Sequence, residues 1–269
     1  MAEHTAPEEW LSFREHRNHT LAGQHGWLSL TGLYWLDADP AEVDSLPGRW
    51  SADATGAHLA ADRADGLRLC ATGEPVDGSL AVQLADEESL MWVQYGGDDG
   101  GRVVVELARR GGRYALRPRD AASPVLTGFT GVPTFDYRPD LVVAGRFEPY
   151  PAPVQVPIRT AHPRVPGTLA AIGEVVFSLA GTEYRLQVSD AGDGALGLTF
   201  HDGTNGTETA GWRSLALPAP AADGSVVLDF NRAVNYPSAF TPYGTCPMPA
   251  DGNRIEAGVP AGEKRPDAG

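Results

Sequence analysis

Glycine and proline interrupt this sequence so often that they constrain its fold more than any other feature. The 269 residues include 32 glycines and 22 prolines. Glycine favours turns, and proline is poorly tolerated inside helices and central strands. This composition therefore favours short strands and many turns over long helices. We predict a mainly β protein.

The best helical segment lies at the N-terminus, where we predict a helix within residues 1–23. Thr5 and Glu8 have the spacing of a capping box, Pro7 suits the first turn, and Gly23 suits the end. The apolar stretch GWLSLTGLYWL at 26–36 comes next. Its aromatic residues predict burial, either as a strand or as a short helix.

Residues 24–122 have the pattern of an antiparallel β-sandwich. Short, often alternating apolar segments are separated by glycine or aspartate turns, as in SLMWVQYG, GRVVVELARR and RYALRPRD. The RRGG stretch at 109–112 predicts a hairpin turn between the last two of these segments.

A proline-rich region at 123–167 separates this sandwich from the second half of the chain. Its proline density predicts that it contains neither regular helix nor central strands, and we place a domain boundary near residue 123. Strand patterns then resume, and we predict a second antiparallel β-domain over 123–269, a sheet or a small barrel with a proline-rich C-terminal cap. Five segments carry these strands: LAAIGEVVFSLAG, TEYRLQVSD, GALGLTFHD, GWRSLALP and GSVVLDFNR.

The charge of the chain argues against two classes of partner. The formal net charge is −14 and the arginines are scattered, so nucleic acid and anionic membranes would be repelled. Neither a secretory signal nor an apolar stretch of membrane-spanning length is present, which predicts a soluble cytoplasmic protein. Cys70 and Cys246 could form one bridge but not a disulfide framework.

The first candidate site is FHDGTNGTETAGWR at 200–213. Asp202, Thr204 and Asn205 cluster at a strand end, with Glu208 and Arg213 close by. Such a turn can point several oxygen atoms in one direction. An ordinary hairpin loop, in which Asp and Thr bond their own backbone, explains the same pattern.

The second candidate is the stiff, proline-rich segment LDFNRAVNYPSAFTPYGTCPMPADGNRIEAG at 228–258. It could line a pocket in which Arg232 holds an anionic group and Tyr243 or Cys246 lies near the reacting atom. Alternatively, its polar side chains satisfy an irregular backbone. These side chains include Asp229, Asn231, Arg232, Asn235 and Asn253.

Several other chemistries have little support in the sequence. A nucleophilic cysteine at Cys246 needs an imidazole, which His162 or His201 could supply, although a small buried thiol is the simpler interpretation. His16 and His19 could share a helix face, but no third ligand is indicated, so we predict no metal site. The sequence also lacks dinucleotide, P-loop, serine-hydrolase and zinc-protease motifs, so we expect no cofactor.

The segment DFNRAVNYPSAFTPYGTCPMPADGNRI…AGEK resembles the terminal signature of a bacterial and archaeal family catalogued as domain of unknown function 1684. WLSLTGLYWL, RYALRPRD and DGTNG also resemble that family. Ser238 and Ala210 depart from it, since cysteine and tyrosine are usual there. The resemblance carries a set of signature positions onto this chain: Asp202, Thr204, Gly206, Arg213, Asp229, Asn231, Arg232, Asn235, Cys246, Asn253, Glu263 and Lys264.

The first half also resembles a forkhead-associated sandwich, in that a set of strands opens after GLYWL and closes on RYALRPRD. The phosphothreonine-binding pattern of those domains is not legible, so the resemblance implies architecture only.

Three hypotheses for the function remain open. The first is an enzyme without cofactor that acts on a small polar or anionic metabolite by acid–base chemistry. Asp202 or Glu208 would be its base, Arg213 and Arg232 would hold the anion, and Asn231 and Asn253 would donate to an oxyanion. Glu263 and Lys264 could close that site.

The second hypothesis is a non-catalytic small-molecule-binding module that uses the same pocket. The third is a structural signature with no pocket. The sequence does not determine the oligomeric state.

Overall fold

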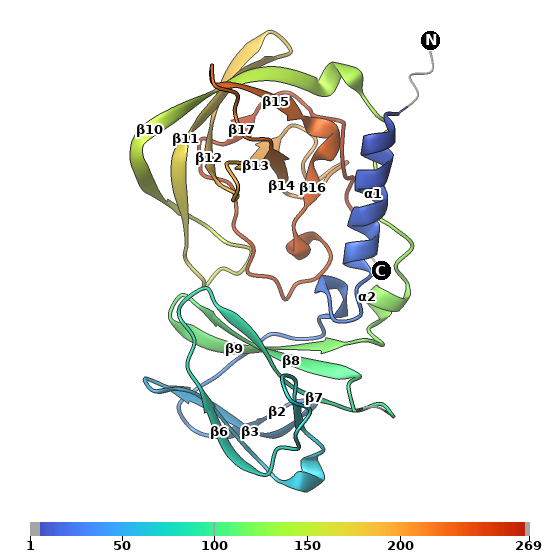
Figure 1. The fold of residues 1–269 in the computed structure, drawn as a ribbon, viewed down its shortest axis with the longest axis vertical. Coiled ribbons are helices and arrows are strands. Elements are labelled where there is room, and N and C mark those ends of the chain that lie inside the picture. Colours follow the sequence, from blue (N-terminus) through green and yellow to red (C-terminus); the bar gives the residue numbers. More distant parts are fainter. Residues whose placement is uncertain (1–5, 99, 267–269) are drawn as a thin grey trace. The chain divides into compact units, whose positions relative to one another are not determined.

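The computed structural model describes residues 6–98 and 100–266, and the chain divides into two compact units (Figure 1). The sandwich unit runs from Thr20 to Phe129. The signature unit combines the N-terminal segment up to His19 with the chain from Thr130 onward. We predicted breaks after residues 23 and 122, and the compact units change over after residues 19 and 129.

The N-terminal helix α1 spans Glu8–Leu21. Thr5 of the predicted capping box lies outside the described residues. The apolar stretch at 26–36 forms a short 3₁₀ helix, Trp27–Ser29, followed by a two-residue strand. No helix among the described residues has the length and apolar composition that crossing a membrane requires.

The sandwich unit contains two antiparallel sheets, with strand orders β1-β9-β8-β7-β5 and β2-β3-β4-β6. Its strands are β1 Tyr34–Trp35, β2 Ala41–Val43, β3 Leu46–Asp53, β4 Gly56–Ala61, β5 Arg68–Leu69, β6 Gly78–Val82, β7 Ser89–Tyr95, β8 Val103–Arg110 and β9 Arg113–Asp120. The helix α2 comes after them at Pro124–Thr127. The predicted hairpin joins β8 to β9 through Gly111 and Gly112, whose φ angles of 57° and 75° suit glycine.

One apolar core lies between these two sheets. Trp50 of one sheet and Trp92 of the other pack edge to face with ring centroids 5.5 Å apart. Leu59 and Leu107 belong to the same buried cluster. The sandwich architecture is therefore observed, while the likeness to forkhead-associated domains stays a prediction.

The signature unit is built on one large antiparallel sheet in the order β15-β10-β11-β12-β13-β14-β16. The sheet does not close into a barrel, and the short strand β17 pairs in parallel with β13. The strands are β10 Val142–Ile158, β11 Gly167–Leu179, β12 Thr182–Asp190, β13 Leu196–Asp202, β14 Arg213–Leu217, β15 Ser225–Asp229, β16 Val234–Asn235 and β17 Arg254–Ile255.

The prediction that the proline-rich region contains neither regular helix nor central strands was wrong. The short helix α2 lies within it, with Pro124 at the first helical position, where proline is tolerated. Strand β10 runs from Val142 to Ile158 and lies between β15 and β11. Its partner β15 pairs only with residues 142–146, so the rest of β10 has a single neighbour. Pro149, Pro151, Pro153 and Pro157 all lie in that outer part, where a missing N–H breaks no ladder on the open side.

The core of the signature unit lies on one face of this sheet. Alternating residues of β12 and β13 point into it, including Leu186, Val188, Leu198 and Phe200. Phe230, directly after β15, packs against Phe200 with ring centroids 5.7 Å apart. Strand β13 ends at Asp202, two residues beyond this buried ring.

Candidate functional site

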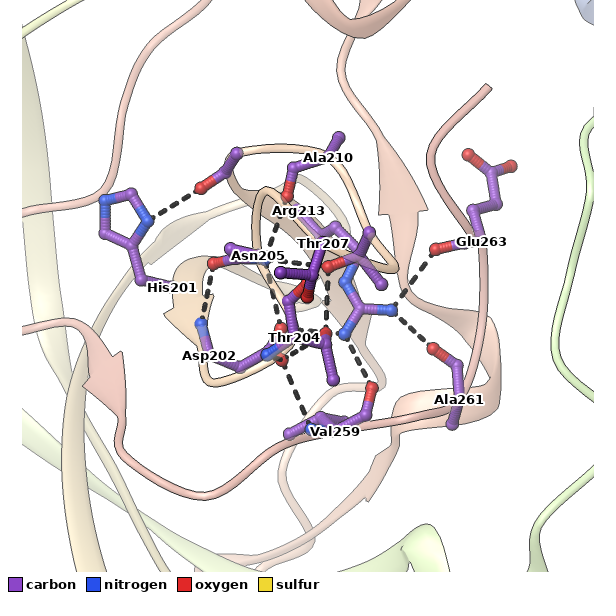
Figure 2. A network of polar contacts seen from close by, with 12 residues as sticks. His201, Asp202, Thr204, Asn205, Thr207, Ala210, Arg213, Val259, Ala261 and Glu263 are labelled. Atoms are coloured by element: carbon purple, nitrogen blue, oxygen red, sulfur yellow. Dashed lines mark hydrogen bonds and ion pairs between the residues drawn. The ribbon is translucent and has the colours of Figure 1, made fainter. Parts of the chain in front are cut away.

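Asp202 ends strand β13, and both oxygens of its carboxylate are occupied by protein donors (Figure 2). Oδ1 accepts from the backbone N–H and the hydroxyl of Thr204 and from the N–H of Val259, at 3.2 Å. Oδ2 accepts from Arg213 at 2.8 Å and from Asn205 at 3.3 Å. With only 2% of its surface exposed, Asp202 is fully engaged inside the protein.

Arg213 begins strand β14 and is completely buried. Besides binding Asp202, its guanidinium donates to the carbonyl oxygens of Val259 at 2.8 Å, of Ala261, and of Glu263 at 3.4 Å (Figure 2). Burial lowers its pKa from the ordinary value, and the carboxylates of Asp202 and Glu263 oppose that shift. The guanidinium thus ties the end of β13 to the C-terminal segment.

The loop between β13 and β14 is closed by its own side chains. Asn205 accepts from the N–H of Asp202 at 2.8 Å and donates to the carbonyl of Ala210 at 2.9 Å (Figure 2). Its amide also donates to the hydroxyl of Thr209 at 2.9 Å. The predicted cluster of Asp, Thr and Asn therefore exists, with its oxygens bound to donors of the loop, of Arg213 and of Val259.

Glu263 is the second buried carboxylate, and α1 supplies its cationic partners. Oε1 accepts from Arg14 and Arg17, each at 3.0 Å, and Oε2 accepts from the N–H of Asn235 at 2.6 Å. Asn235 returns a bond from its side chain to the carbonyl of Lys264 at 2.8 Å. The helix and the C-terminal segment are joined through one carboxylate with no exposed surface.

Asn231 anchors the turn that comes directly after β15. Its side chain exchanges hydrogen bonds with the backbone of Arg138, at 2.7 and 2.9 Å, and its carbonyl accepts from Trp10 of α1 at 2.9 Å. Asp229 caps the same turn by accepting from the N–H of Asn231. Arg232 is partly exposed, lies 3.4 Å from Asp229, and stacks over Phe13.

Asn253 bridges two strands where their own pairing stops. β12 and β13 are paired only at Ser189 and Asp190. Beyond that point the Asn253 side chain accepts from the N–H of Gln187 and donates to the carbonyls of Gln187 and Thr199, at 2.8 to 2.9 Å. It therefore replaces part of the missing ladder.

The remaining predicted site residues lie outside these networks. Glu208 is exposed, and only its backbone has a described contact, accepting from the N–H of Arg265. Tyr243 is half-buried on the loop before β17, and the ammonium of Lys264 stacks over Phe135 at 4.8 Å. Cys246 is buried and not in a disulfide, and its carbonyl accepts from Ala161.

The contacts join most signature residues into three groups. The first, which we call the lock, contains Asp202, Thr204, Asn205, Arg213, Asn235 and Glu263, together with Arg14 and Arg17. Asp229, Asn231 and Arg232 form the second group, and Asn253 acts alone. The sequence analysis missed the anchors Trp10, Arg14 and Arg17, whose helix has a weak amphipathic pattern.

Ala210 and Ser238, the two departures from the family pattern, lie in a loop and in a short helix. Ala210 is buried, and its carbonyl closes the Asn205 loop. Ser238 lies in a short 3₁₀ helix, Pro237–Ala239. Ser238 and the thiol of Cys246 both approach Gly244, where an added Cβ would lie 3.4 and 3.3 Å from them.

Fold and contacts together define a mainly β protein whose polar signature residues bind one another and the backbone. The family model described as a protein of unknown function, DUF1684, matches residues 127–264. That match spans just over half of the chain, so the protein belongs to this family. The resemblance seen in the sequence is confirmed.

The chain is also similar to an uncharacterised protein of Haloarcula marismortui whose structure was solved by NMR in solution. The two are 27% identical over 51% of this chain and 78% of the other, with a TM-score of 0.43. No curated protein matches this chain.

Proposed function

We propose that the protein is a non-catalytic small-molecule-binding module and that the lock is its rigid frame, not an acid–base centre. The observation that carries the non-catalytic part of this proposal is the engagement of the Asp202 carboxylate. Both of its oxygens already accept from Thr204, Asn205, Arg213 and Val259.

A general base must reach the proton it removes, at a distance of about 2.6–3.2 Å. Asp202 is only 2% exposed, and no part of Arg213 is exposed to receive an anionic group. Arg213 also directs its donors to Asp202 and to the carbonyl oxygens of the C-terminal segment. These contacts favour a structural role for the residues that the enzyme hypothesis would need most.

A structural role also accounts for the polar density of the signature segment, residues 229–264. This segment is short of regular strands, so its backbone groups need side-chain partners. Asn231, Asn235 and Asn253 each bond backbone groups of distant segments. The segment is thereby held to α1 and to the sheet.

The lock is tested by replacing one oxygen of the Asp202 carboxylate with an amino group. Asp202→Asn should lower the melting temperature and speed hydrogen–deuterium exchange at residues 259–264, which are far away in sequence. Glu208→Gln is the matched control, because that side chain is exposed on the same loop. Unchanged exchange at 259–264 in Asp202→Asn would contradict the lock.

The binding module and the enzyme are distinguished by native mass spectrometry of the purified protein, followed by mass spectrometry of its denatured extract. A co-purified small molecule that is recovered chemically unchanged supports a binding module. Conversion of that molecule by the wild-type protein, lost in Glu208→Gln or Tyr243→Phe, would favour an enzyme instead.

A further inference from the structure

A hollow in the signature unit lies apart from the lock and has a different chemistry. It has a volume of about 450 Å³ and is lined by residues 158–166 together with Met248. Pockets that hold small ligands commonly have volumes of about 300–1,000 Å³. The hollow is therefore large enough for a small metabolite.

The charges around this hollow are all of one sign. Arg159 and Arg164 line it beside the imidazole of His162, and the described residues of its lining include no aspartate or glutamate. The whole chain, in contrast, has 35 acidic residues and a net charge of −14. A local cationic site on such a protein attracts anions that the rest of its surface repels.

The turn that carries these cations is fixed by internal hydrogen bonds. The Thr160 hydroxyl lies 3.0 Å from the carbonyl oxygen of His162 and 2.8 Å from that of Val165. Pro163 and Pro166 restrict the backbone further, and Val165 is buried. Binding would therefore cost little ordering of the backbone.

A second segment braces the turn from the C-terminal side. The N–H of Met248 donates to the carbonyl of Arg159 at 2.9 Å, and the N–H of Ala161 donates to the carbonyl of Cys246 at 2.8 Å. This pairing holds the Met248 side chain at the hollow. Ile158, Val165 and Met248 give the lining an apolar part beside its cations.

The imidazole at this site has a defined orientation. The N–H of Arg164 donates to Nδ1 of His162 at 3.3 Å. Nδ1 therefore accepts, and the hydrogen of the neutral ring is on Nε2.

We propose that this hollow binds a small molecule with one anionic group, a carboxylate or a phosphate, on an apolar body. Arg159 and Arg164 bind the anion, and Met248 and Val165 contact the apolar body. The proposal rests on the proposed function only in taking the protein to be a binding module, and it does not depend on the lock.

The test is a titration followed by NMR of ¹⁵N-labelled full-length protein. Benzoate and phenyl phosphate are the probes, benzyl alcohol is the neutral control, and inorganic phosphate lacks the apolar body. We expect both aromatic anions to shift the amide signals of residues 158–166 and 248, and the two controls to bind at least tenfold more weakly. Signals that shift elsewhere, or equal affinity for benzyl alcohol, overturn the proposal.

The double variant Arg159→Gln/Arg164→Gln tests the role of the arginines. Both side chains are exposed, so the variant should keep the wild-type melting temperature. We expect at least a tenfold loss of affinity for benzoate, while Arg254→Gln, an exposed arginine of β17, leaves it unchanged. Unchanged affinity in the double variant overturns the proposal.

The two proposals fail separately. If hydrogen–deuterium exchange at residues 259–264 in Asp202→Asn equals that of wild type, the lock is refuted. Benzoate binding would then still test the hollow. If benzoate does not shift the amide signals of residues 158–166 and 248 in the wild-type protein, the binding proposal for the hollow is refuted and the lock is unaffected.

Discussion

Both units bury a carboxylate among arginines, but they draw those arginines from different distances along the chain. In the sandwich unit, Glu106 of β8 pairs with Arg117 and Arg119 of the neighbouring strand β9, which lie 11 and 13 residues away. In the signature unit, Glu263 pairs with Arg14, 249 residues away. One network supports a hairpin, and the other joins segments from the two ends of the chain.

This difference explains why similar chemistry has different structural consequences. The Glu106 network holds two strands that already pair through their backbones. Arg119 also donates hydrogen bonds to the carbonyls of His25 and Gly26. The segment around Glu263 lies outside the strands and has only an isolated bridge to Thr134, so the side chains of Arg213 and Glu263 carry much of its connection. Removing one side chain should therefore disturb a wider region in the signature unit.

The largest expected effect is that of Arg213→Met. This change leaves the Asp202 carboxylate buried without its cation and the carbonyl of Ala261 without its arginine donor, while the carbonyl of Val259 keeps only the N–H of Ala261. Breaking a buried pair in this way costs about 3–5 kcal/mol of unfolding free energy. Urea denaturation measures the loss, and hydrogen exchange should rise across α1 and residues 259–264.

Exchange confined to the loop at 203–212 in Arg213→Met would remove the distinction between the two networks. Arg254→Met is the matched control, because that side chain is exposed. It should change the unfolding free energy by less than about 0.5 kcal/mol.

A smaller effect is expected from Asn253→Ala. The change leaves the backbone of Gln187 and the carbonyl of Thr199 unpaired where β12 and β13 separate. Unsatisfied buried groups cost about 1–3 kcal/mol. Faster exchange at Gln187 with an unaltered sandwich unit would support the bridging role, and wild-type stability would contradict it.

The sandwich unit should differ in its response to acid. Burial alone raises the pKa of Glu106, but Arg119 and Arg117 outweigh it and hold this pKa below its ordinary value. The ion pairs therefore stabilise the fold above the carboxyl pKa of the unfolded chain, and this contribution is lost as pH falls through the folded pKa.

Glu106→Gln measures this contribution directly. At neutral pH we expect a loss of roughly 1–2 kcal/mol, because hydrogen bonds to charged groups contribute about 1.5–3 kcal/mol. The difference in urea midpoint from wild type should shrink as pH falls below about 4. A difference in urea midpoint that stays constant with pH would mean that the pKa of Glu106 is the same in the folded and unfolded states.

The smallest effect is expected at Arg232, although it lies in the same signature segment as the lock. Its side chain is 36% exposed and lies 3.4 Å from Asp229 and 3.9 Å from Glu9. Exposed pairs contribute about 0–1 kcal/mol, so Arg232→Ala should shift the melting temperature little. A loss as large as that of Arg213→Met would show that exposure does not separate the two arginines.

The β-rich architecture was predictable because it arises from local patterns. Alternating apolar residues and glycine turns marked five strands of the signature unit, and all five segments contain a strand. Strand β10 was missed because proline content was interpreted without knowing that most of the strand has one neighbour only. Edge position is a property of the sheet, not of the segment.

The candidate residues were also identified by type, since Asp202, Arg213, Asn235 and Glu263 do meet in one network. Whether they face a ligand or the backbone could not be inferred, because burial and hydrogen-bond partners depend on segments far apart in sequence. The anchors Arg14 and Arg17 gave no local signal, as their partner is 249 and 246 residues away.

By itself, the sequence determined that this chain is built mainly of antiparallel strands, carries an N-terminal helix, and has a polar family signature; it did not determine the length of the strands, since β10 has 17 residues and β11 has 13. Alternation, turn residues and composition act over a few residues, so they can be recognised locally. Only the tertiary structure decided what the signature residues bind. A carboxylate such as Asp202 can act as a general base or as a structural hydrogen-bond acceptor. Which role it has depends on the donors that folding brings to its two oxygens.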